Sequence, residues 1–507
     1  MPAVWLGGTL TLPDVVAVAR EGAVVQLSPE AIRRVERARA LVDQLVRSRT
    51  PVYGVTTGFG KFSDVIISPD QTVQLQRNLL MSHACGVGDP LPEEVVRAMM
   101  LLRAQALAQG HSGIRPETLR LLVEMLNRGV HPVVPSQGSL GASGDLAPLA
   151  HMALPLIGLG EAYYQGQRLS GEEALRRAGL RPVELSSKEG LALINGTQAM
   201  TGIGALALYD ALGLAKVADI AAALTAEALG AIAAAWDPRI QALRRHKGQA
   251  ESAENLRLLV RGSRLITRPG QLRVQDAYTL RCIPQVHGAS RGALSHVAEV
   301  LGGELNAVTD NPLLFPDDGT VISGGNFHGQ PVALAMDYLA IAVAELADMA
   351  ERRIERLVNP ALSGLPAFLT RQGGLHSGLM IPQYTAASLV SENKVLAHPA
   401  SVDSIPSSAN QEDHVSMGTT AARKARQVVA NTTRVLAIEL LCAAQAVEFV
   451  GPEGLGAGTR AAYRAVRDVV PPLDGDRVLA PDIERLAVLI HSGGLVKAVE
   501  AAVGPLR

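Results

Sequence analysis

The feature that most constrains the fold is a long, alanine-rich apolar stretch at residues 203–236. Alanine has the highest intrinsic helix propensity, and the stretch lacks the strict alternation of apolar and polar residues that marks a half-buried strand. Four charged side chains interrupt it, namely Asp210, Lys216, Asp219 and Glu227. Because such charges are costly inside a bilayer, we expect a long helix buried in protein and not a membrane span.

Composition extends this expectation to the whole chain. Only 3% of the residues are aromatic, so alanine, leucine, valine and isoleucine must fill the core, which favours closely packed helices over a β-sandwich. Helical spacing of apolar residues recurs at residues 31–47, 92–109, 116–128, 331–356 and 377–397, whereas residues 9–19 suggest a short strand and turn. We predict a mainly α fold, a long-helix bundle with a smaller, loop-rich N-terminal region. Its segments would be 1–200, 201–450 and 451–507, forming one continuous catalytic unit.

Charge and cysteine content narrow the function classes. A formal net charge of −1 gives no electrostatic case for binding nucleic acid or an anionic membrane surface. The three cysteines are scattered along the chain, which predicts a reducing compartment and no disulfide framework. The N-terminus lacks the basic region and cleavage site of a signal peptide, so we expect a cytoplasmic protein. No His-Glu-x-x-His pattern occurs, and a metal site is not expected.

A second feature is the string Gly-Ser-Leu-Gly-Ala-Ser-Gly-Asp-Leu-Ala-Pro at residues 138–148, which places three glycines around Ser143. Glycine permits backbone conformations that a Cβ forbids, so the amide nitrogen of Gly144 can approach the carbonyl carbon of Ala142. Attack and loss of one water would close a five-membered ring in the main chain. Loss of a second water, from Ser143, would leave a methylidene on that ring. The product would be a strong electrophile made only from protein.

Other interpretations of this string remain open. It could be a glycine-rich turn without chemistry. A phosphate-binding loop is disfavoured, because the glycines at 138, 141 and 144 lack the required spacing and no lysine follows them. A serine-hydrolase nucleophile elbow requires Gly-x-Ser-x-Gly, whereas here the last glycine directly follows Ser143. A serine hydrolase stays as the remote enzymatic alternative.

The string at 138–148 resembles the prosthetic-group loop of the aromatic amino-acid ammonia-lyases. Six further segments resemble that family in the same order along most of the chain, at residues 53–60, 78–88, 188–197, 270–282, 323–330 and 404–417. The resemblance implies an ammonia-lyase/fumarase-like fold and a 4-methylidene-imidazol-5-one (MIO) group formed from Ala142-Ser143-Gly144, without an external cofactor. It also implies a homotetramer whose active sites are built from several subunits.

The resemblance gives roles to side chains near that group. The family's match to Tyr53 is the favoured general base, and its matches to Asn195 and Phe327 lie near the MIO. Taken alone, Asn195 could be a helix N-cap and Phe327 a plug for the core. The base stays open between Tyr53, Tyr278 and Glu412.

A further segment supplies candidates for binding the substrate. Gln275, Tyr278 and Arg281 are three residues apart, so they can share one helical face or turn. Such a face is often only solvated surface. If its side chains are buried together, however, arginine suits a carboxylate, tyrosine suits proton transfer and glutamine suits positioning.

Two segments indicate the side chain of the substrate. Ser82-His83 and Gln411-Glu412 have the form found in family members that act on histidine, so His83 and Glu412 would address an imidazole ring. The resemblance then implies a carbon–nitrogen lyase that eliminates ammonia from L-histidine to give trans-urocanate, the first step of histidine degradation. Attack on the MIO by the amine or by the ring stays open. The alternatives are a phenylalanine or tyrosine ammonia-lyase, an aminomutase, or a helical scaffold without activity.

Overall fold

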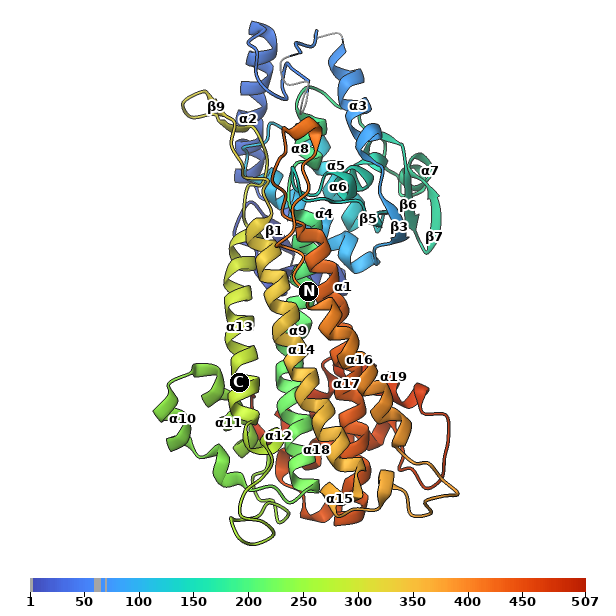
Figure 1. The fold of residues 1–507 in the computed structure, drawn as a ribbon. Helices are drawn as coiled ribbons and strands as arrows, with labels where there is room; N and C mark the ends of the chain where they lie inside the picture. The colour runs from blue at the N-terminus through green and yellow to red at the C-terminus, as the bar shows by residue number, and fades with distance from the viewer. Residues whose placement is uncertain (1–2, 59–64, 69–70) are drawn as a thin grey trace. The chain divides into compact units, whose positions relative to one another are not determined.

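The computed structural model describes residues 3–58, 65–68 and 71–507, and most of them are helical (Figure 1). The prediction of a mainly α fold is confirmed. The chain divides into two compact units. The first unit consists of Met1–Leu206, Glu299–Asp337 and Pro399–Arg423, and the second of Ala207–Ala298, Tyr338–His398 and Lys424–Arg507. The proposed segments 1–200, 201–450 and 451–507 stay a prediction.

The first unit combines short helices with small sheets. Its helices are α1 (Leu12–Glu21), α2 (Pro29–Ser48), α3 (Thr72–His83), α4 (Glu93–Ala108), α5 (Pro116–Asn127), α6 (Leu146–Ala153), α7 (Gly171–Arg177) and α8 (Glu189–Ile194). Strands pair as β1 (Val4–Leu6) with β2 (Val25–Leu27), β3 (Val87–Pro90) with β5 (Pro135–Gln137), β4 (His131–Pro132) with β6 (Glu161–Tyr164) and β7 (Gln167–Ser170), and β8 (Leu313–Phe315) with β9 (Thr320–Ile322). The β1–β2 pair is parallel and the others are antiparallel.

Helix α4 lies in the core of the first unit. Every residue from Val95 to Ala108 is buried, so the helix is enclosed on all sides. Two arginines, Arg97 and Arg103, are buried with it, and both donate hydrogen bonds to backbone carbonyls. The core therefore contains guanidinium groups that hold backbone segments in addition to apolar packing.

Two local expectations differ from the structure. The strand and turn expected at residues 9–19 are instead the start of α1, because Thr11 and Asp14 form a reciprocal capping box at its N-terminus. Asn195 does not cap the N-terminus of a long helix. It is the C-cap residue of α8, with φ −89° and ψ 86°.

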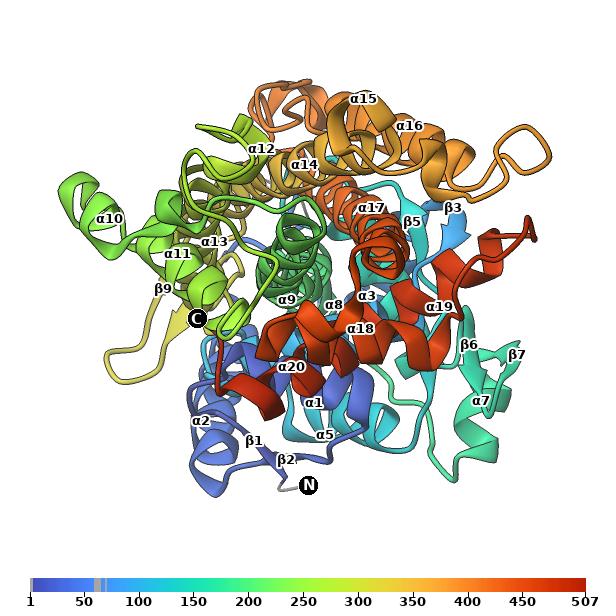
Figure 2. The same cartoon turned by 90° about the horizontal axis from the view of Figure 1, so that it is seen from below.

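The second unit contains most residues of the long helices. The helix expected at residues 203–236 is present but ends at Ala228, and Ala233–Trp236 form a separate 3-10 helix. The elements of the second unit include α9 (Gln198–Ala228), α10 (Pro238–Arg244), α11 (Lys247–Leu259), α12 (Tyr278–Arg281), α13 (Ile283–Glu304), α14 (Gln330–Val358), α15 (Pro360–Ser363), α16 (Met380–Leu396), α17 (Gly418–Val450), α18 (Ala457–Val469), α19 (Ala480–His491) and α20 (Gly494–Val503). Viewed from below, α9 lies in the middle with α13, α14, α17 and α20 around it (Figure 2).

Buried charges inside the second unit are compensated by one another. Asp219 of α9 accepts hydrogen bonds from His287 Nδ1 at 2.8 Å and from Arg291 Nη2 at 2.7 Å, both on α13. Burial alone would raise the pKa of Asp219, but Arg291 and His287 hold it below its ordinary value. Arg353 of α14 is fully buried and donates to Glu439 of α17. The charges in the alanine-rich helix are thus explained by partners in the bundle.

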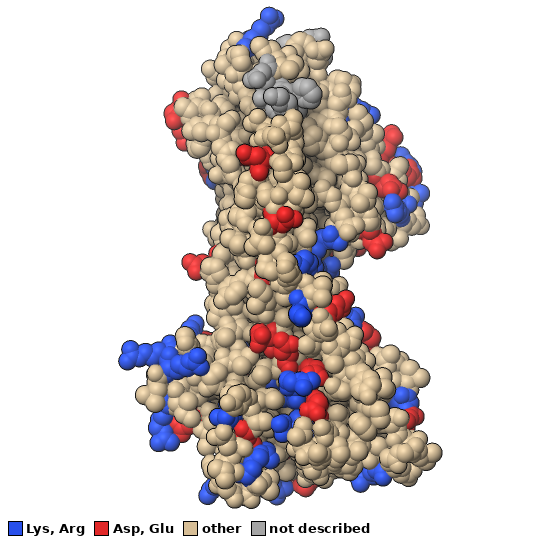
Figure 3. Space-filling view, in the orientation of Figure 1, with Lys and Arg blue, Asp and Glu red and all other residues tan. Residues whose placement is uncertain are grey.

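Within the described ranges, no single helix is both long and apolar enough to span a membrane, although the bent pair α19 and α20 passes that test together. On the face drawn in Figure 3, lysine and arginine are interspersed with aspartate and glutamate, in keeping with the net charge of −1.

Candidate active site

Five of the predicted site residues line one cavity of about 740 Å³ in the first unit. They are Tyr53, His83, Ser143, Asn195 and Glu412. The remaining walls come from α3, from Leu146 at the start of α6, from Leu191 of α8 and from residues 58, 65, 67, 408 and 409. Phe59 and Gly60, which belong to the predicted tyrosine loop, lie outside the described residues. The cavity therefore joins Ser143 to candidates from four distant sequence segments.

The backbone around Ser143 requires glycine. Gly141 and Gly144 both have φ of +75°, the left-handed region that side chains rarely adopt. A Cβ placed on Gly144 would lie 2.2 Å from the carbonyl oxygen of Gly196, closer than any atom can approach without displacement. Ala142 is buried beside this turn, and Ser143 faces the cavity. The turn is therefore close-packed on one side and open to the cavity at its serine, which fits a backbone-derived electrophile.

Asp145 ties this turn to its surroundings. Its amide donates to the carbonyl of Gly196 at 2.6 Å, and its carboxylate accepts from the Ser139 hydroxyl and the Met200 amide, each at 2.8 Å. The Thr419 hydroxyl donates to the same carboxylate. Burial raises the pKa of Asp145, and these hydrogen bonds oppose that effect. Asp145 therefore joins the turn to the first residues of α9 and α17.

Asn195 presents an unused acceptor at the cavity. Its side-chain amide donates from Nδ2 to the carbonyl oxygen of Asn311 at 3.0 Å, which fixes the plane of the group. Its Oδ1 is buried and accepts no hydrogen bond from any described residue. A buried acceptor without a partner is costly, so this oxygen is suited to an N–H group of a bound molecule.

His83 is held as a neutral imidazole. Burial lowers its pKa, although Glu412 and the hydrogen bond with Leu79 act in the opposite direction. Its Nδ1 lies 2.9 Å from the Leu79 carbonyl oxygen, which can only accept, so the proton is on Nδ1. Nε2 therefore carries the lone pair and can accept a hydrogen bond.

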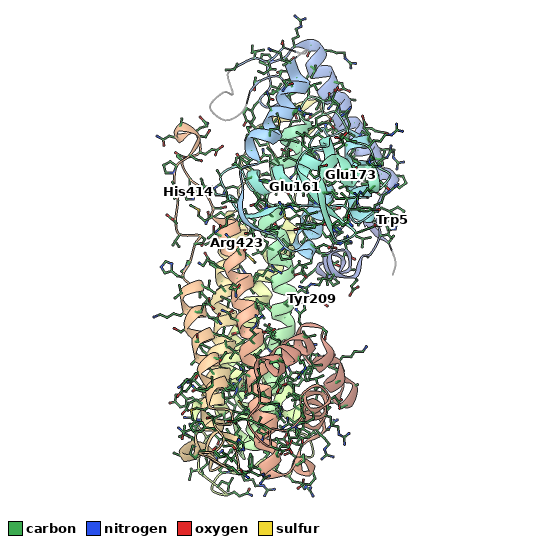
Figure 4. All side chains as sticks on the ribbon, turned by 90° about the vertical axis from the view of Figure 1, so that its right-hand side faces the viewer. Trp5, Glu161, Glu173, Tyr209, His414 and Arg423 are labelled. Carbon is green, nitrogen blue, oxygen red and sulfur yellow. The ribbon has the colours of Figure 1, made fainter. Side chains whose placement is uncertain are left out.

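Glu412 follows a strained segment of the cavity wall. Ser408, Ala409 and Asn410 all have positive φ, between 51° and 67°, which costs about 1–2 kcal/mol for each non-glycine residue. Ser407 and Glu412 close this bend through backbone hydrogen bonds, and the Ser407 hydroxyl donates to Oε2 of Glu412 at 3.1 Å. Figure 4 labels His414, two residues after Glu412 in the sequence. Strain of this kind is common at binding sites.

Three further predicted site residues, Gln275, Tyr278 and Arg281, lie in the second unit. Gln275 and Arg281 line a separate pocket of about 290 Å³. Tyr278 and Arg281 lie on the single turn α12, which Gln275 precedes, and the guanidinium carbon of Arg281 lies 4.5 Å from the Tyr278 ring centroid. Tyr278 is 69% exposed, and the buried Nε of Arg281 has no partner among the described residues.

Phe327 and Gln411 are not among the residues that line either pocket. Phe327 is half-buried in its loop, and Gln411 is exposed. Two residues without a predicted role bear on the site more directly: Asp145, and Arg103, which donates to the Asn195 carbonyl. The position of Arg103 between apolar residues, Leu101-Leu102 before it and Ala104 after it, is the signal that could have found it, because a buried charge requires specific partners.

Comparison with known proteins extends over the whole chain. A family model described as aromatic amino acid lyase matches residues 10–468. The histidine ammonia-lyase of Symbiobacterium thermophilum is 77% identical over 507 residues, covering 100% of both chains. The crystal structure of histidine ammonia-lyase from Trypanosoma cruzi superposes with a TM-score of 0.92 at 46% identity, covering 99% of this chain and 96% of that one. A tyrosine aminomutase from Streptomyces globisporus superposes with a TM-score of 0.96 at 41% identity, covering 100% of both chains.

Proposed function

Because this chain belongs to the aromatic amino acid lyase family, we propose that it eliminates ammonia from L-histidine to give trans-urocanate. The observation that carries this proposal is the joint presence of Ser143, His83 and Glu412 in one cavity. The full-length similarity to proteins named histidine ammonia-lyase supports the same substrate.

The proposal includes formation of the MIO from Ala142-Ser143-Gly144. The Gly144 nitrogen bonds to the Ala142 carbonyl carbon, and its proton passes to the carbonyl oxygen. That oxygen leaves as water with the proton from the Ser143 nitrogen, and the Ser143 hydroxyl leaves as a second water with the α-proton. No oxidant is needed. The finished group would supply an electron-poor methylidene that activates the substrate for loss of ammonia.

The side chains of the cavity divide the work of binding and proton transfer. Nε2 of His83 accepts a hydrogen bond from the imidazole N–H of the substrate, and the Glu412 carboxylate binds the same ring. Oδ1 of Asn195 accepts from the substrate amine, which gives this buried atom its missing partner. Tyr53 lines the same cavity and is our candidate for removal of the β-proton.

We propose that Arg281 binds the substrate carboxylate in a bidentate pair and that a second copy of the chain supplies it. The exposed apolar side chains near Arg281, namely Leu272, Val274 and Tyr278, support burial against another copy. So do exposed apolar residues on α14 and α16, which include Tyr338, Ile341, Ile381, Tyr384 and Val395. A homotetramer with shared active sites would bury both sets.

An absorbance assay for urocanate tests the substrate. The purified protein should convert L-histidine, and it should turn over L-phenylalanine and L-tyrosine at least about a hundredfold more slowly, because His83 and Glu412 provide polar partners that a phenyl ring leaves unpaired. Preference for either aromatic amino acid would contradict the proposal. A β-amino acid product would instead identify an aminomutase, as in the Streptomyces globisporus protein.

A further inference from the structure

Arg103 is a fully buried cation whose hydrogen bonds go to neutral acceptors. Its guanidinium donates to the carbonyl of Ala192 at 2.9 and 2.5 Å and to the carbonyl of Asn195 at 3.2 Å. It also donates to the Thr309 carbonyl at 2.9 Å and to Oε1 of Gln198 at 3.0 Å. Most buried arginines are paired with a carboxylate, as Arg353 is with Glu439 in the second unit.

The charge of Arg103 persists despite this burial. Burial lowers its pKa to about 10, and the charge of Asp310 partly offsets that effect. The side chain therefore remains protonated near neutral pH, when every N–H of its rigid fork can donate. Charge-assisted hydrogen bonds are stronger than neutral ones, so the carbonyls they engage are held firmly.

Two of the carbonyls that Arg103 holds, those of Ala192 and Asn195, belong to the segment that packs against the Ser143 turn. Ala192 and Asn195 form the end of α8, and the next residue, Gly196, accepts the Asp145 amide through its carbonyl at 2.6 Å. Gly144 and Gly196 also form a parallel backbone bridge. A Cβ on Gly196 would lie 2.2 Å from Nη1 of Arg103, so nothing separates the guanidinium from this backbone.

A second buried cation reinforces the same frame. Lys188 donates to Oδ2 of Asp310 at 2.9 Å, with both side chains fully buried, and Oδ1 of Asp310 accepts the Asn311 amide at 2.7 Å. The Asn311 carbonyl in turn accepts from the Asn195 side chain. Arg103 therefore fixes the backbone of Asn195, while the Lys188–Asp310 pair fixes its side chain.

We propose that Arg103 is a positioning residue for ring closure at Ala142-Ser143-Gly144. Its hydrogen bonds to the carbonyls of Ala192 and Asn195 restrict the backbone that leads to Gly196. The Gly196 carbonyl then accepts the Asp145 amide and packs against Gly144. The Gly144 nitrogen is then kept against the Ala142 carbonyl carbon. Reactions between held groups are sensitive to displacements of about 1 Å, which can slow them about a hundredfold. The inference rests on the proposed formation of the MIO.

Arg97 provides a matched control on the same helix. It is also buried, and it donates to the carbonyls of Val18 in α1 and Leu126 in α5, not to the α8 carbonyls that Arg103 holds. Arg103→Lys and Arg97→Lys both keep the positive charge and lose the planar fork. Both should lower the melting temperature. A difference between the two variants in the rate of ring closure would therefore not be due to lost stability alone.

The experiment follows the mass of the peptide containing Ser143 after cell-free synthesis of the full chain, in the folded fraction only. Arg103→Lys should lose the two waters at least about tenfold more slowly than the wild type. Arg97→Lys should match the wild-type rate. Gln198→Ala removes one acceptor of Arg103 and its link to Thr309, so it should show a smaller slowing. If Arg103→Lys yields no folded fraction, Gln198→Ala provides the decisive rate.

Closure at the wild-type rate in folded Arg103→Lys, or equal slowing in Arg97→Lys, would overturn the positioning role. If Arg103→Lys does not fold, ring closure at the wild-type rate in Gln198→Ala would also overturn the positioning role. A wild-type peptide that never loses two waters would instead refute the MIO proposal itself, which distinguishes the two failures.

Discussion

The Ser143 cavity and the Arg281 pocket hold their polar groups in different ways. Asn195 on the cavity wall and Asp145 beside Ser143 are buried and fixed by hydrogen bonds to surrounding backbone. In the pocket, the Nε of Arg281 has no partner among the described residues, and Tyr278 on the same helical turn is exposed. The cavity is preorganised by its own unit, whereas the pocket presents unpaired groups that a bound molecule or second copy would satisfy.

This difference separates two tasks. The proposed backbone chemistry at Ala142-Ser143-Gly144 would demand a fixed geometry, which Asp145 and Arg103 of the first unit can supply. The proposed carboxylate binding would demand an available guanidinium, which the second unit carries on the short helix α12. We therefore expect substitutions in the cavity to affect chemistry and substitutions in the pocket to affect assembly of the site.

The largest effect is expected for Ser143→Ala. The variant cannot form the methylidene, so turnover of L-histidine should fall at least about a thousandfold, beyond the loss of a single electrostatic contact. Peptide mass spectrometry should show no loss of two waters, and circular dichroism should show an unchanged fold. An active Ser143→Ala variant would show that the reaction does not depend on Ser143, and the proposed chemical role of the cavity would be wrong.

Co-expressing an inactive and a weakened variant tests whether the cavity and the pocket of one site come from different chains. Arg281→Ala should raise KM and reduce kcat/KM by about 10- to 100-fold, because a charged hydrogen-bonded pair is lost. Co-expressed with Ser143→Ala, it should form mixed oligomers in which roughly a quarter of the sites are intact. The measured activity should then exceed that of either variant alone. Activity no higher than the average of the two would place both residues of a site in one chain.

A smaller effect is expected at the cavity wall. His83→Leu removes the acceptor for the imidazole ring and should lower kcat/KM for L-histidine about tenfold, while turnover of L-phenylalanine should not fall. Cys85→Ala is the control, because Cys85 is exposed on the same chain segment and does not line the cavity. Equal losses for both substrates would indicate a structural role for His83.

The smallest effect at neutral pH is expected from His131, which is buried in the first unit outside the cavity. Burial and the neighbouring Arg97 lower its pKa to about 4. The unfolded chain binds this proton near pH 6.5, so stability is fully present above pH 6.5 and is lost as the pH falls towards 4. His131→Asn should flatten the decline of the denaturation midpoint across that range while leaving activity at pH 7 unchanged. A decline as steep as that of the wild type would assign the acid sensitivity to other groups.

Helices with continuous apolar spacing could be predicted from the sequence, because their local pattern determines them. α4 and α5 begin and end within a residue or so of the expected bounds. α1 was missed because the hydrogen bonds of Thr11 and Asp14, and not apolar spacing, define its start. Asn195 ends α8 because α8 and α9 are separate helices, and the sequence alone gives no clear sign of the break between them.

The candidate site was predictable as a set of residues and less so as an arrangement. The motifs named Tyr53, His83, Ser143, Asn195 and Glu412, and these line one cavity. The anchoring of Asn195 was not predictable, because Asn311 and Arg103 reach it from distant segments. The spacing of residues in the sequence likewise could not predict that Gln275 and Arg281 line a separate pocket, since this depends on which unit those residues fold into.

The contact between Gly144 and Gly196 has a practical consequence for redesign. Neither position can accept a side chain, since each added Cβ would meet main-chain or guanidinium atoms within 2.2 Å. Mutant libraries designed to accept other amino acid substrates should therefore leave Gly144 and Gly196 unchanged. Ser82, Leu75 and Val65 also line the cavity, and we expect them to be better positions for substitution. Changes there would alter selectivity without touching the turn proposed to form the electrophile.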